Sequence, residues 1–145
     1  MKLHLLLADD DVDDIDFFKD ALDEIESNVQ FSFVKNGVEL MSYLTSDESP
    51  KPDLLFLDLN MPKKSGIECI DEIKANDTIN QIPIMVFSTS LDKMVVDDLY
   101  ASGADRYIQK PGEFSNLKKV IKKALDLFGG SQTPPRSREE FIIQP

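Results

Sequence analysis

Cysteine and histidine are scarce in this chain, which has one of each among its 145 residues. The single cysteine, Cys69, excludes an intrachain disulfide and a zinc cluster held by thiolates. The single histidine, His4, lies inside an apolar run typical of a strand, so we interpret it as a core or edge residue. Ser-His-Asp triads and histidine-bound zinc therefore have no support in this sequence.

Long hydrophobic runs and positive charge are also lacking. No apolar run approaches the length of a membrane span, and the N-terminus lacks the basic stretch and cleavage region of a signal peptide. We therefore expect a cytoplasmic protein that does not bind membranes. The chain has 16 Lys and Arg against 27 Asp and Glu, a net charge of −11. This acidic surplus argues against direct binding of nucleic acid and favours a metal ion or a basic partner surface.

The residues that are present predict one α/β domain, since 41% of them are hydrophobic and 30% are charged. Short apolar runs, each typical of a buried strand, alternate with segments of helical period. The expected strands are residues 4–8, 31–34, 54–57, 84–87 and 106–109. Strict alternation of strands and helices predicts a mainly parallel sheet with helices on both faces.

The pattern of the domain ends near Phe128, and Gly129-Gly130 follows it. We expect a domain over residues 1–128 and a C-terminal extension over 129–145, with no effector domain. Pro134-Pro135 and the polar residues around it are typical of a flexible extension. The apolar end, Phe141-Ile142-Ile143, could nevertheless be held against something.

Polar side chains follow four of the five expected strands. Asp9 and Asp10 follow the first strand, Asp58 the third, Ser88 the fourth and Lys110 the fifth. Ligands of open parallel sheets bind at the carboxyl ends of the strands. The sequence therefore predicts one site that contains these side chains.

Each part of this site also has a simpler interpretation. The acidic run 9–14 could be a solvated helix start, where carboxylates favour the positive end of the helix dipole, and Lys110 could be a surface lysine. Asp58 differs because four apolar residues precede it, which places it at the mouth of the sheet. Clustered carboxylates repel one another unless a cation is bound, and Mg²⁺ suits a few oxygen ligands and several waters. Pro111 fixes the backbone beside Lys110, so we favour a functional lysine.

Carboxylates, a metal, a hydroxyl and an ammonium group are the parts that phosphoryl transfer requires. An aspartate could serve as the nucleophile and form an aspartyl phosphate. The sequence has neither Gly-x-x-x-x-Gly-Lys nor Gly-x-Gly-x-x-Gly. The phosphoryl group is therefore expected to come from something other than bound ATP.

These residues, in this order, resemble the receiver domain of two-component response regulators. The resemblance rests on Asp9-Asp10, Asp58-Leu59-Asn60-Met61-Pro62 with Gly66, Ser88, Tyr107 and Lys110-Pro111. Residues 58–64 and 87–90 are most similar to stand-alone receivers grouped with the regulators of bacterial phytochrome kinases. The resemblance implies a flavodoxin-like, doubly wound fold with five parallel strands in the order 2-1-3-4-5.

The resemblance also implies the role of each acidic residue. Asp58 would accept a phosphoryl group from a sensor histidine kinase or a phosphotransfer protein. Asp10 and Asp58 would bind Mg²⁺ directly together with the backbone carbonyl of Asn60, and Asp9 would act through water. Asp11 would be an extra acid or a helix cap.

Further roles follow from the same resemblance. Ser88 and Lys110 would contact phosphoryl oxygens, and Ser88 and Tyr107 would move together as a conformational switch. Asn60 and Ser90 would tune dephosphorylation. The chain departs from many receivers at Thr89, which could narrow the entrance to the site, and at Gly112, which could loosen its loop. The bond between Lys110 and Pro111 is expected to be cis.

We therefore expect a single-domain response regulator that changes its partner-binding surface and turns over no external substrate. The expected partners are the phosphodonor and a downstream protein target. A homodimer could form through the fourth helix, fifth strand and fifth helix, where acidic residues and lysines of opposite charge occur; these are Asp97, Asp98, Lys118, Lys119, Lys122 and Lys123. The lysines could equally be the solvated face of the last helix.

Two alternatives stay open. One is a Mg²⁺-dependent phosphatase with an aspartyl nucleophile, although it would need an acidic residue where this chain has Asn60. The other is a receiver-like binding module that is never phosphorylated, and the full set of acidic, hydroxyl and lysine residues counts against it.

Overall fold

Six parallel strands form one sheet in the computed structural model of the chain, which describes residues 3–25, 28–89, 92–129 and 138–145. The strands are β1 (Leu3–Ala8), β2 (Val29–Val34), β3 (Leu54–Leu57), β4 (Ile84–Ser88), β5 (Arg106–Gln109) and β6 (Ile142–Ile143). Their order is β2-β1-β3-β4-β5-β6, and every neighbouring pair is parallel. The helices are α1 (Val12–Ile25), α2 (Gly37–Thr45), α3 (Gly66–Lys74), α4 (Lys93–Ser102), α5 (Phe114–Gly129) and α6 (Arg138–Phe141).

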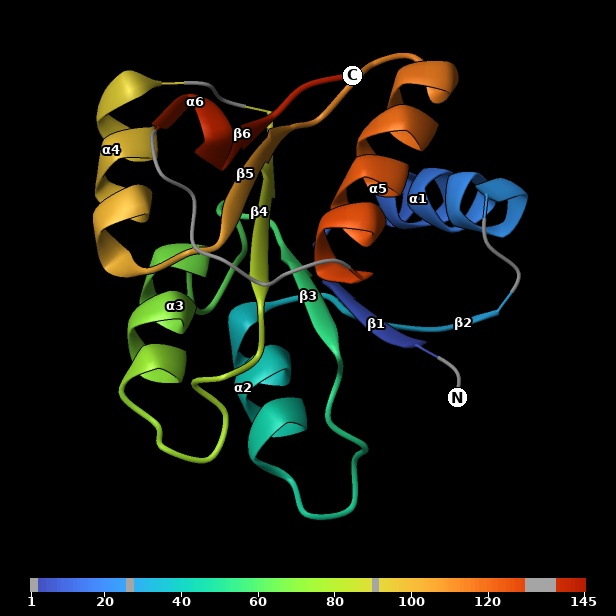
Figure 1. Cartoon of the computed structure of the whole chain (residues 1–145). Helices are drawn as coiled ribbons and strands as arrows, with labels where there is room; N and C mark the ends of the chain where they lie inside the picture. Colours follow the sequence, from blue (N-terminus) through green and yellow to red (C-terminus); the bar gives the residue numbers. More distant parts are fainter. Residues whose placement is uncertain (1–2, 26–27, 90–91, 130–137) are drawn as a thin grey trace.

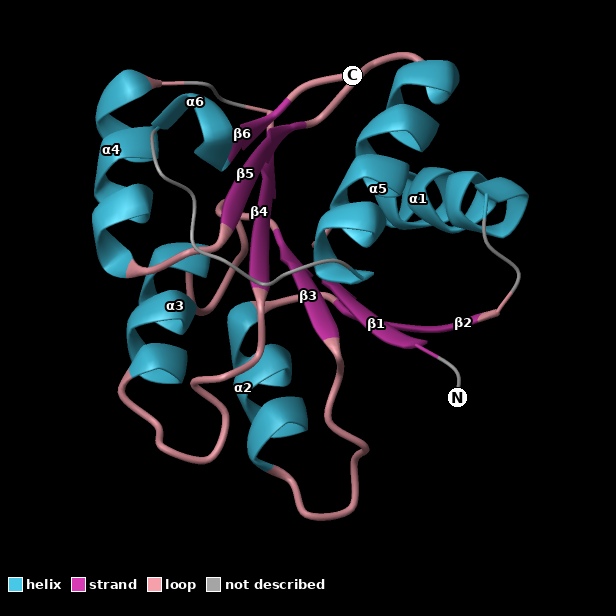
Figure 2. Cartoon of the chain, in the orientation of Figure 1, coloured by secondary structure: helices cyan, strands magenta, loops and turns pink. Residues whose placement is uncertain are grey.

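Helices cover both faces of the sheet, as Figures 1 and 2 show. Helices α1 and α5 pack together on one face, whereas α2, α3 and α4 follow one another across the other. Each face has its own hydrophobic core, and the central strands contribute alternate residues to the two cores. Strands β3 and β4 are buried along their whole length, which explains why both appear as continuous apolar runs in the sequence.

Local side-chain bonds fix where several helices begin and end. The side chain of Asn36 accepts a hydrogen bond from the backbone of Glu39 at the start of α2, and Ser65 forms a capping box with Glu68 at the start of α3. Gly103 ends α4 with a φ of 95°, a left-handed conformation that glycine adopts without strain. The sequence therefore defines the starts of α2 and α3 and the end of α4 locally.

The predicted α/β fold is confirmed, and the first five strands have the expected order 2-1-3-4-5. The sixth strand was not predicted. It contains only Ile142 and Ile143, which pair with Tyr107 and Ile108 of β5, and two residues are too few to produce a strand period. The apolar end of the chain is therefore held against the domain, although its composition favoured a flexible extension.

His4 is a buried residue of β1, as its sequence context indicates. Its Nε2 lies 3.0 Å from the hydroxyl of Ser32 and 3.3 Å from that of Tyr43, and its Nδ1 lies 3.3 Å from the carbonyl oxygen of Lys51. These contacts satisfy the ring within the fold. In the part of the chain that the structure describes, no helix combines the length and the apolar character needed to cross a membrane.

Candidate functional site

The polar residues that follow the strands come together at the carboxyl ends of the parallel strands, as the sequence predicts. Asp9 lies directly after β1 and Asp58 directly after β3, and these two strands are neighbours in the sheet. The backbone N–H of Asp58 donates to the carbonyl of Ala8 at 2.9 Å, which places the two aspartates side by side. The backbone N–H of Lys110 donates to the carbonyl of Ser88 at 2.8 Å, which places the lysine at the end of β5 against β4.

Three carboxylates form an acidic cluster at the carboxyl ends of the strands. Asp9, Asp10 and Asp58 each offer one oxygen atom, and these atoms lie within 4.8 Å of one another. Asp9 and Asp58 are buried, whereas Asp10 is exposed. Carboxylate oxygens are the preferred ligands of hard divalent cations, so the cluster fits a metal ion that keeps part of its water shell on the exposed side.

Lys110 supplies the positive charge of the site. Its Nζ lies 2.8 Å from Oδ2 of Asp9, 3.0 Å from Oδ2 of Asp14 and 3.4 Å from Oδ2 of Asp58. The same Nζ lies 5.5 Å from the centre of the Phe87 ring, within the range of a cation–π contact. Only 10% of the Lys110 side chain is exposed, and its ammonium lies between carboxylates, so Lys110 is not a surface lysine.

Burial raises the pKa of Asp58 to about 6, and Lys110 opposes this rise while the neighbouring Asp9 adds to it. Burial also raises the pKa of Asp9, against the hydrogen bond from Lys110. Burial alone would lower the pKa of Lys110. Its hydrogen bond to Asp9 and the charge of Asp58 outweigh burial, so this pKa lies above its ordinary value. The two buried carboxylates are therefore not fully neutralised by one lysine, and an additional cation would be favoured beside them.

The loop after Asp58 is shaped to present its carboxylate. The backbone N–H of Asn60 donates to Oδ1 of Asp58 at 3.3 Å, and that of Gly66 donates to the carbonyl of Leu59 at 3.0 Å. A Cβ atom at Gly66 would lie 2.5 Å from the carbonyl oxygen of Asp58, so only glycine permits this approach. Asn60 itself is exposed beside the acidic cluster.

Ser88 and Tyr107 lie next to this cluster in neighbouring strands, and both are fully buried. A hydrogen bond joins their side chains. Burial raises the pKa of Tyr107, this bond to Ser88 opposes the rise, and the charge of Asp58 adds to it. Tyr107 and Ser88 therefore form a buried pair, and Tyr107 is close enough to Asp58 for that carboxylate's charge to affect its pKa.

The structure adds residues that the sequence did not single out for the site. Asp14 lies on α1 and reaches Lys110 from the side, and Phe87 lies beneath the lysine. The signal for Asp14 was its place one helical turn after Asp10 and Asp11. Asp11 caps α1, because its Oδ1 accepts the backbone N–H of Asp13 at 2.9 Å.

Other expectations have mixed outcomes. The expected cis bond between Lys110 and Pro111 is wrong: among the described residues no peptide bond is cis. Trans is the ordinary preference even before proline, where the cis form is the minority. The side chain of Thr89 is exposed, and Ser90 lies outside the described residues.

Comparison with known proteins gives an independent result. The family model of the response regulator receiver domain matches residues 5–122. The chain is 30% identical over 122 residues to the response regulator Rcp1 of Synechocystis sp., a match that covers 81% of this chain and 83% of Rcp1. It is also 28% identical over 113 residues to the chemotaxis protein CheY of Listeria monocytogenes, covering 78% of this chain and 93% of CheY.

Solved structures give the same picture. The phosphorylated cyanobacterial phytochrome response regulator RcpA superposes with a TM-score of 0.83 at 30% identity, covering 93% of this chain and 99% of RcpA. The Mn²⁺-bound form of Rcp1 superposes with a TM-score of 0.79 at 28% identity, covering 92% of this chain and 99% of Rcp1.

Proposed function

Because this chain belongs to the response regulator receiver family, we propose that Asp58 accepts a phosphoryl group from a sensor histidine kinase or a phosphotransfer protein. The observation that carries the proposal is the buried Asp58 carboxylate, whose Oδ2 lies 3.4 Å from the Lys110 ammonium. The Asp58 carboxylate therefore lies at the carboxyl end of β3, beside the positive charge that a phosphoryl group requires.

The chain's own side chains have separate tasks in this transfer. A carboxylate oxygen of Asp58 forms the new bond to phosphorus as the bond from phosphorus to the donor's histidine nitrogen breaks. The Lys110 ammonium pairs with one phosphoryl oxygen, and the Ser88 hydroxyl donates a hydrogen bond to another. Asp9 and Asp14 hold the Lys110 ammonium at this position through their contacts of 2.8 and 3.0 Å.

Mg²⁺ is the proposed cofactor. Asp10 and Asp58, with the backbone carbonyl of Asn60, are the residues that would hold it, and Asp9 would act through water. Mg²⁺ bound there supplies charge compensation for the phosphoryl oxygens. The fit rests on the three clustered carboxylates and on the raised pKa of Asp58, which indicates a place where another positive charge is favourable.

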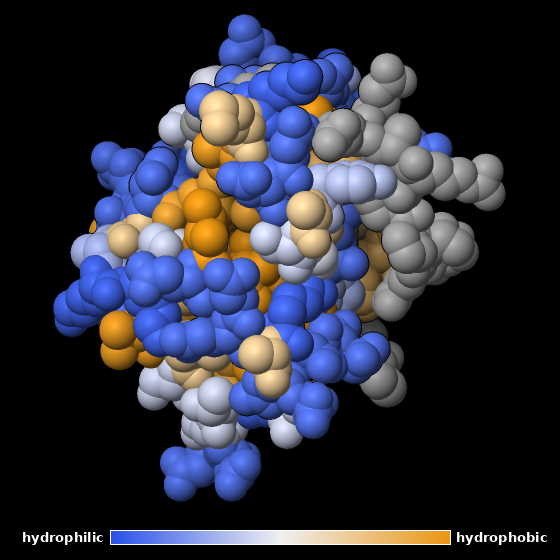
Figure 3. Space-filling view, turned by 90° about the vertical axis from the view of Figure 1, so that its left-hand side faces the viewer, coloured by the Kyte–Doolittle hydropathy of each residue, from blue (hydrophilic) through white to orange (hydrophobic). Residues whose placement is uncertain are grey.

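The proposed output is a change of partner-binding surface in a cytoplasmic regulator, with no turnover of an external substrate. Ser88 and Tyr107 would act as the switch, and Asn60 and Ser90 would tune dephosphorylation. Figure 3 shows apolar atoms gathered between hydrophilic ones on the side of the molecule where α4 and α3 lie in Figure 1, and such a surface suits a downstream protein. Among the exposed large apolar side chains are Met94 of α4 and Ile67 of α3.

A homodimer through α4, β5 and α5 stays a prediction. Two of the lysines on which it depends have partners within the chain. Lys118 pairs with Glu24 at 3.1 Å, and Lys123 donates to the carbonyl oxygen of Gln144 at 2.6 Å. Exposed ion pairs contribute only about 0–1 kcal/mol each, so apolar contacts would have to supply most of the stability of such a dimer.

The function is tested by incubating the protein with Mg²⁺ and a small phosphodonor such as acetyl phosphate, followed by intact-mass measurement. Wild type should gain one labile phosphoryl group, and Asp58→Asn should gain none. Asp77→Asn is the matched control, because Asp77 is an exposed aspartate distant in sequence from the site. It should be labelled like wild type.

Three results would contradict the proposal in different ways. Equal labelling of Asp58→Asn would place the acceptor elsewhere. Absence of any adduct with every donor would favour a receiver-like module that only binds partners. Release of many phosphates per chain would favour the phosphatase alternative, against which the amide of Asn60 counts.

A further inference from the structure

The C-terminal segment 138–145 completes the edge of the sheet beside the proposed switch. Phe141 is fully buried and Ile143 nearly so. Ile142 pairs with Tyr107 in the parallel register of β6 on β5, which Figure 2 shows at the edge of the sheet. Phe141 belongs to the core on the α4 side and Ile143 to the core on the α5 side, so this short segment contributes a buried side chain to each core.

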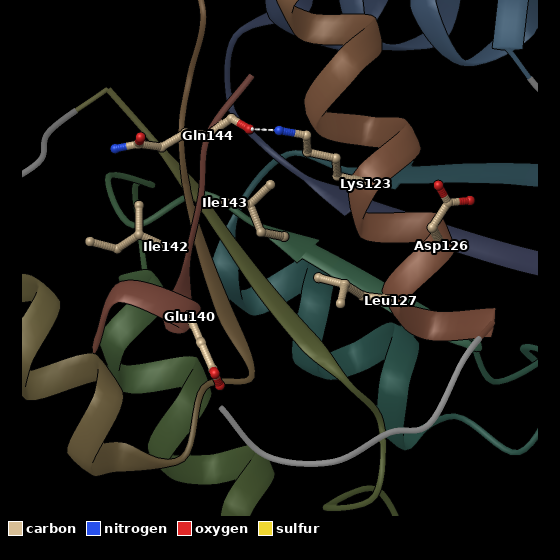
Figure 4. A pocket seen from close by; sticks show the side chains of 7 residues that line it. All are labelled: Lys123, Asp126, Leu127, Glu140, Ile142, Ile143 and Gln144. Atoms are coloured by element: carbon tan, nitrogen blue, oxygen red, sulfur yellow. Dashed lines mark hydrogen bonds between the residues drawn. The ribbon is translucent and has the colours of Figure 1, made fainter. Parts of the chain in front are cut away.

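A bond to α5 holds the end of this segment in place. Figure 4 shows Lys123 extending from α5 to the carbonyl oxygen of Gln144, and the distance is 2.6 Å. Ile143 and Leu127 lie in the cleft between β6 and α5 in the same view. The segment is therefore fixed by strand pairing on one side and by a helix on the other.

Phe141 makes its ring contacts with two tyrosines. The ring centre lies 5.3 Å from that of Tyr100 in an edge-on arrangement, and 6.4 Å from that of Tyr107. Tyr107 is the buried ring whose hydroxyl is hydrogen-bonded to Ser88, beside Asp58. Interiors are close-packed, so a ring that fills the space beside Tyr107 limits the rotamers that Tyr107 can adopt.

We propose that Phe141 is a positioning residue for the Tyr107–Ser88 pair, so that docking of segment 138–145 and phosphoryl binding at Asp58 favour each other. With the segment docked, Tyr107 stays buried and keeps its bond to Ser88. Removal of the ring opens space in which Tyr107 can leave Ser88. Linkage requires that the phosphoryl group tightens docking by the same factor by which docking tightens phosphoryl binding. This inference rests on the proposed function.

The test measures both directions of the linkage, with beryllium fluoride and Mg²⁺ as the phosphoryl mimic. Calorimetry should show that Phe141→Ala weakens binding of the mimic about fivefold or more, and that Phe141→Leu restores most of it. Phe33→Ala is the matched control, because Phe33 is a half-exposed ring in β2 at the opposite edge of the sheet. It should bind the mimic like wild type.

A purely structural role is distinguished by a second background. In Tyr107→Phe, which lacks the hydroxyl that bonds Ser88, the further change Phe141→Ala should leave the affinity for the mimic unchanged although it still lowers the melting temperature. In wild type, hydrogen exchange at the amides of Ile142 and Ile143 should slow when the mimic binds. The expected factor is the one by which Phe141→Ala weakens binding of the mimic.

The outcomes separate this inference from the proposed function. If wild type does not bind the mimic, the proposed function fails and the coupling fails with it. If wild type binds and Phe141→Ala binds equally well, the coupling alone is overturned. Should Phe141→Ala not fold, the exchange experiment on wild type decides, and equal exchange with and without the mimic overturns the coupling.

Discussion

Both ends of the parallel strands carry aspartates, but these carboxylates have different surroundings. Asp53 and Asp105 precede β3 and β5, and each accepts a hydrogen bond from the backbone of a neighbouring strand, from His4 at 2.8 Å and from Ile84 at 2.7 Å. The backbone N–H of Asp53 also donates to the carbonyl of His4 at 2.7 Å, and that of Asp105 donates to the carbonyl of Ile84 at 2.9 Å. These two carboxylates therefore continue the sheet by binding its backbone.

Asp9 and Asp58 at the opposite ends of the strands face other charges. Each accepts one backbone N–H, from Asp11 at 3.0 Å and from Asn60 at 3.3 Å, and turns its second oxygen toward Lys110. Both are buried, and burial raises the pKa of both. The two pairs of aspartates therefore differ in their partners: Asp53 and Asp105 bind backbone N–H groups of neighbouring strands, whereas Asp9 and Asp58 are buried beside the Lys110 ammonium.

The largest expected effect separates the two ends of the strands by chemistry. Asp58→Asn should abolish acceptance of a phosphoryl group, because an amide oxygen is a poor nucleophile, whereas Asp105→Asn should leave acceptance unchanged. Intact-mass measurement after treatment with acetyl phosphate and Mg²⁺ checks both variants. Loss of labelling in Asp105→Asn would show that the amino end of the strands also contributes to the reaction.

The next effect concerns the positive charge of Lys110 beside Asp9 and Asp58. Lys110→Met should slow phosphorylation of Asp58 about 100-fold, because no ammonium then offsets the charge that develops on the phosphoryl oxygens. Lys118→Met is the control, since its exposed pair with Glu24 lies outside the site. Initial rates of phosphoryl transfer from acetyl phosphate measure the difference, and equal rates for Lys110→Met and wild type would remove the lysine from the proposed reaction.

These predictions also show how far the sequence could lead. Apolar runs and their ends predict which residues reach the sheet edge, because burial imposes a period on the sequence, and Asp9, Asp58 and Lys110 were found in this way. Asp14 and Phe87 complete the lysine's surroundings from α1 and β4, and contacts between elements leave no period in the sequence. The sequence did not predict the roles of Asp53 and Asp105 for the same reason, because each binds the backbone of a neighbouring strand.

A third effect is a change of stability with pH in the absence of divalent cations. The pKa of Asp58 is about 6 in the folded protein, against an ordinary value of 3.8 for an aspartate in the unfolded chain. The folded state therefore binds this proton more tightly, and stability falls as pH rises through this window. Asp58→Asn removes the loss and should raise the free energy of unfolding at pH 7.5 by up to about 3 kcal/mol. Below pH 4 the gain should vanish.

Urea unfolding at several pH values, with a chelator present, measures this gain. Lys110 keeps its contacts with Asp9 and Asp14 in the variant, so the lysine is not left without a carboxylate partner. A gain that is constant across the pH range would mean that ionisation of Asp58 is not its source. Mg²⁺ should reduce the difference, because Asp58 belongs to the proposed Mg²⁺ site and a cation bound there would stabilise the folded wild type.

The smallest expected effect belongs to the structural end. Asp105→Ala should lower the free energy of unfolding by about 1–3 kcal/mol, because the backbone N–H of Ile84 loses its partner, while Asp105→Asn keeps an acceptor oxygen and should cost less. Unlike the gain from Asp58→Asn, this loss should persist at every pH at which the carboxylate is ionised, and Mg²⁺ should not change it. Urea unfolding with and without Mg²⁺ checks this. A Mg²⁺-dependent loss would mean that the two ends of the strands are coupled, because the backbone bond at Ile84 would then influence the distant acidic cluster.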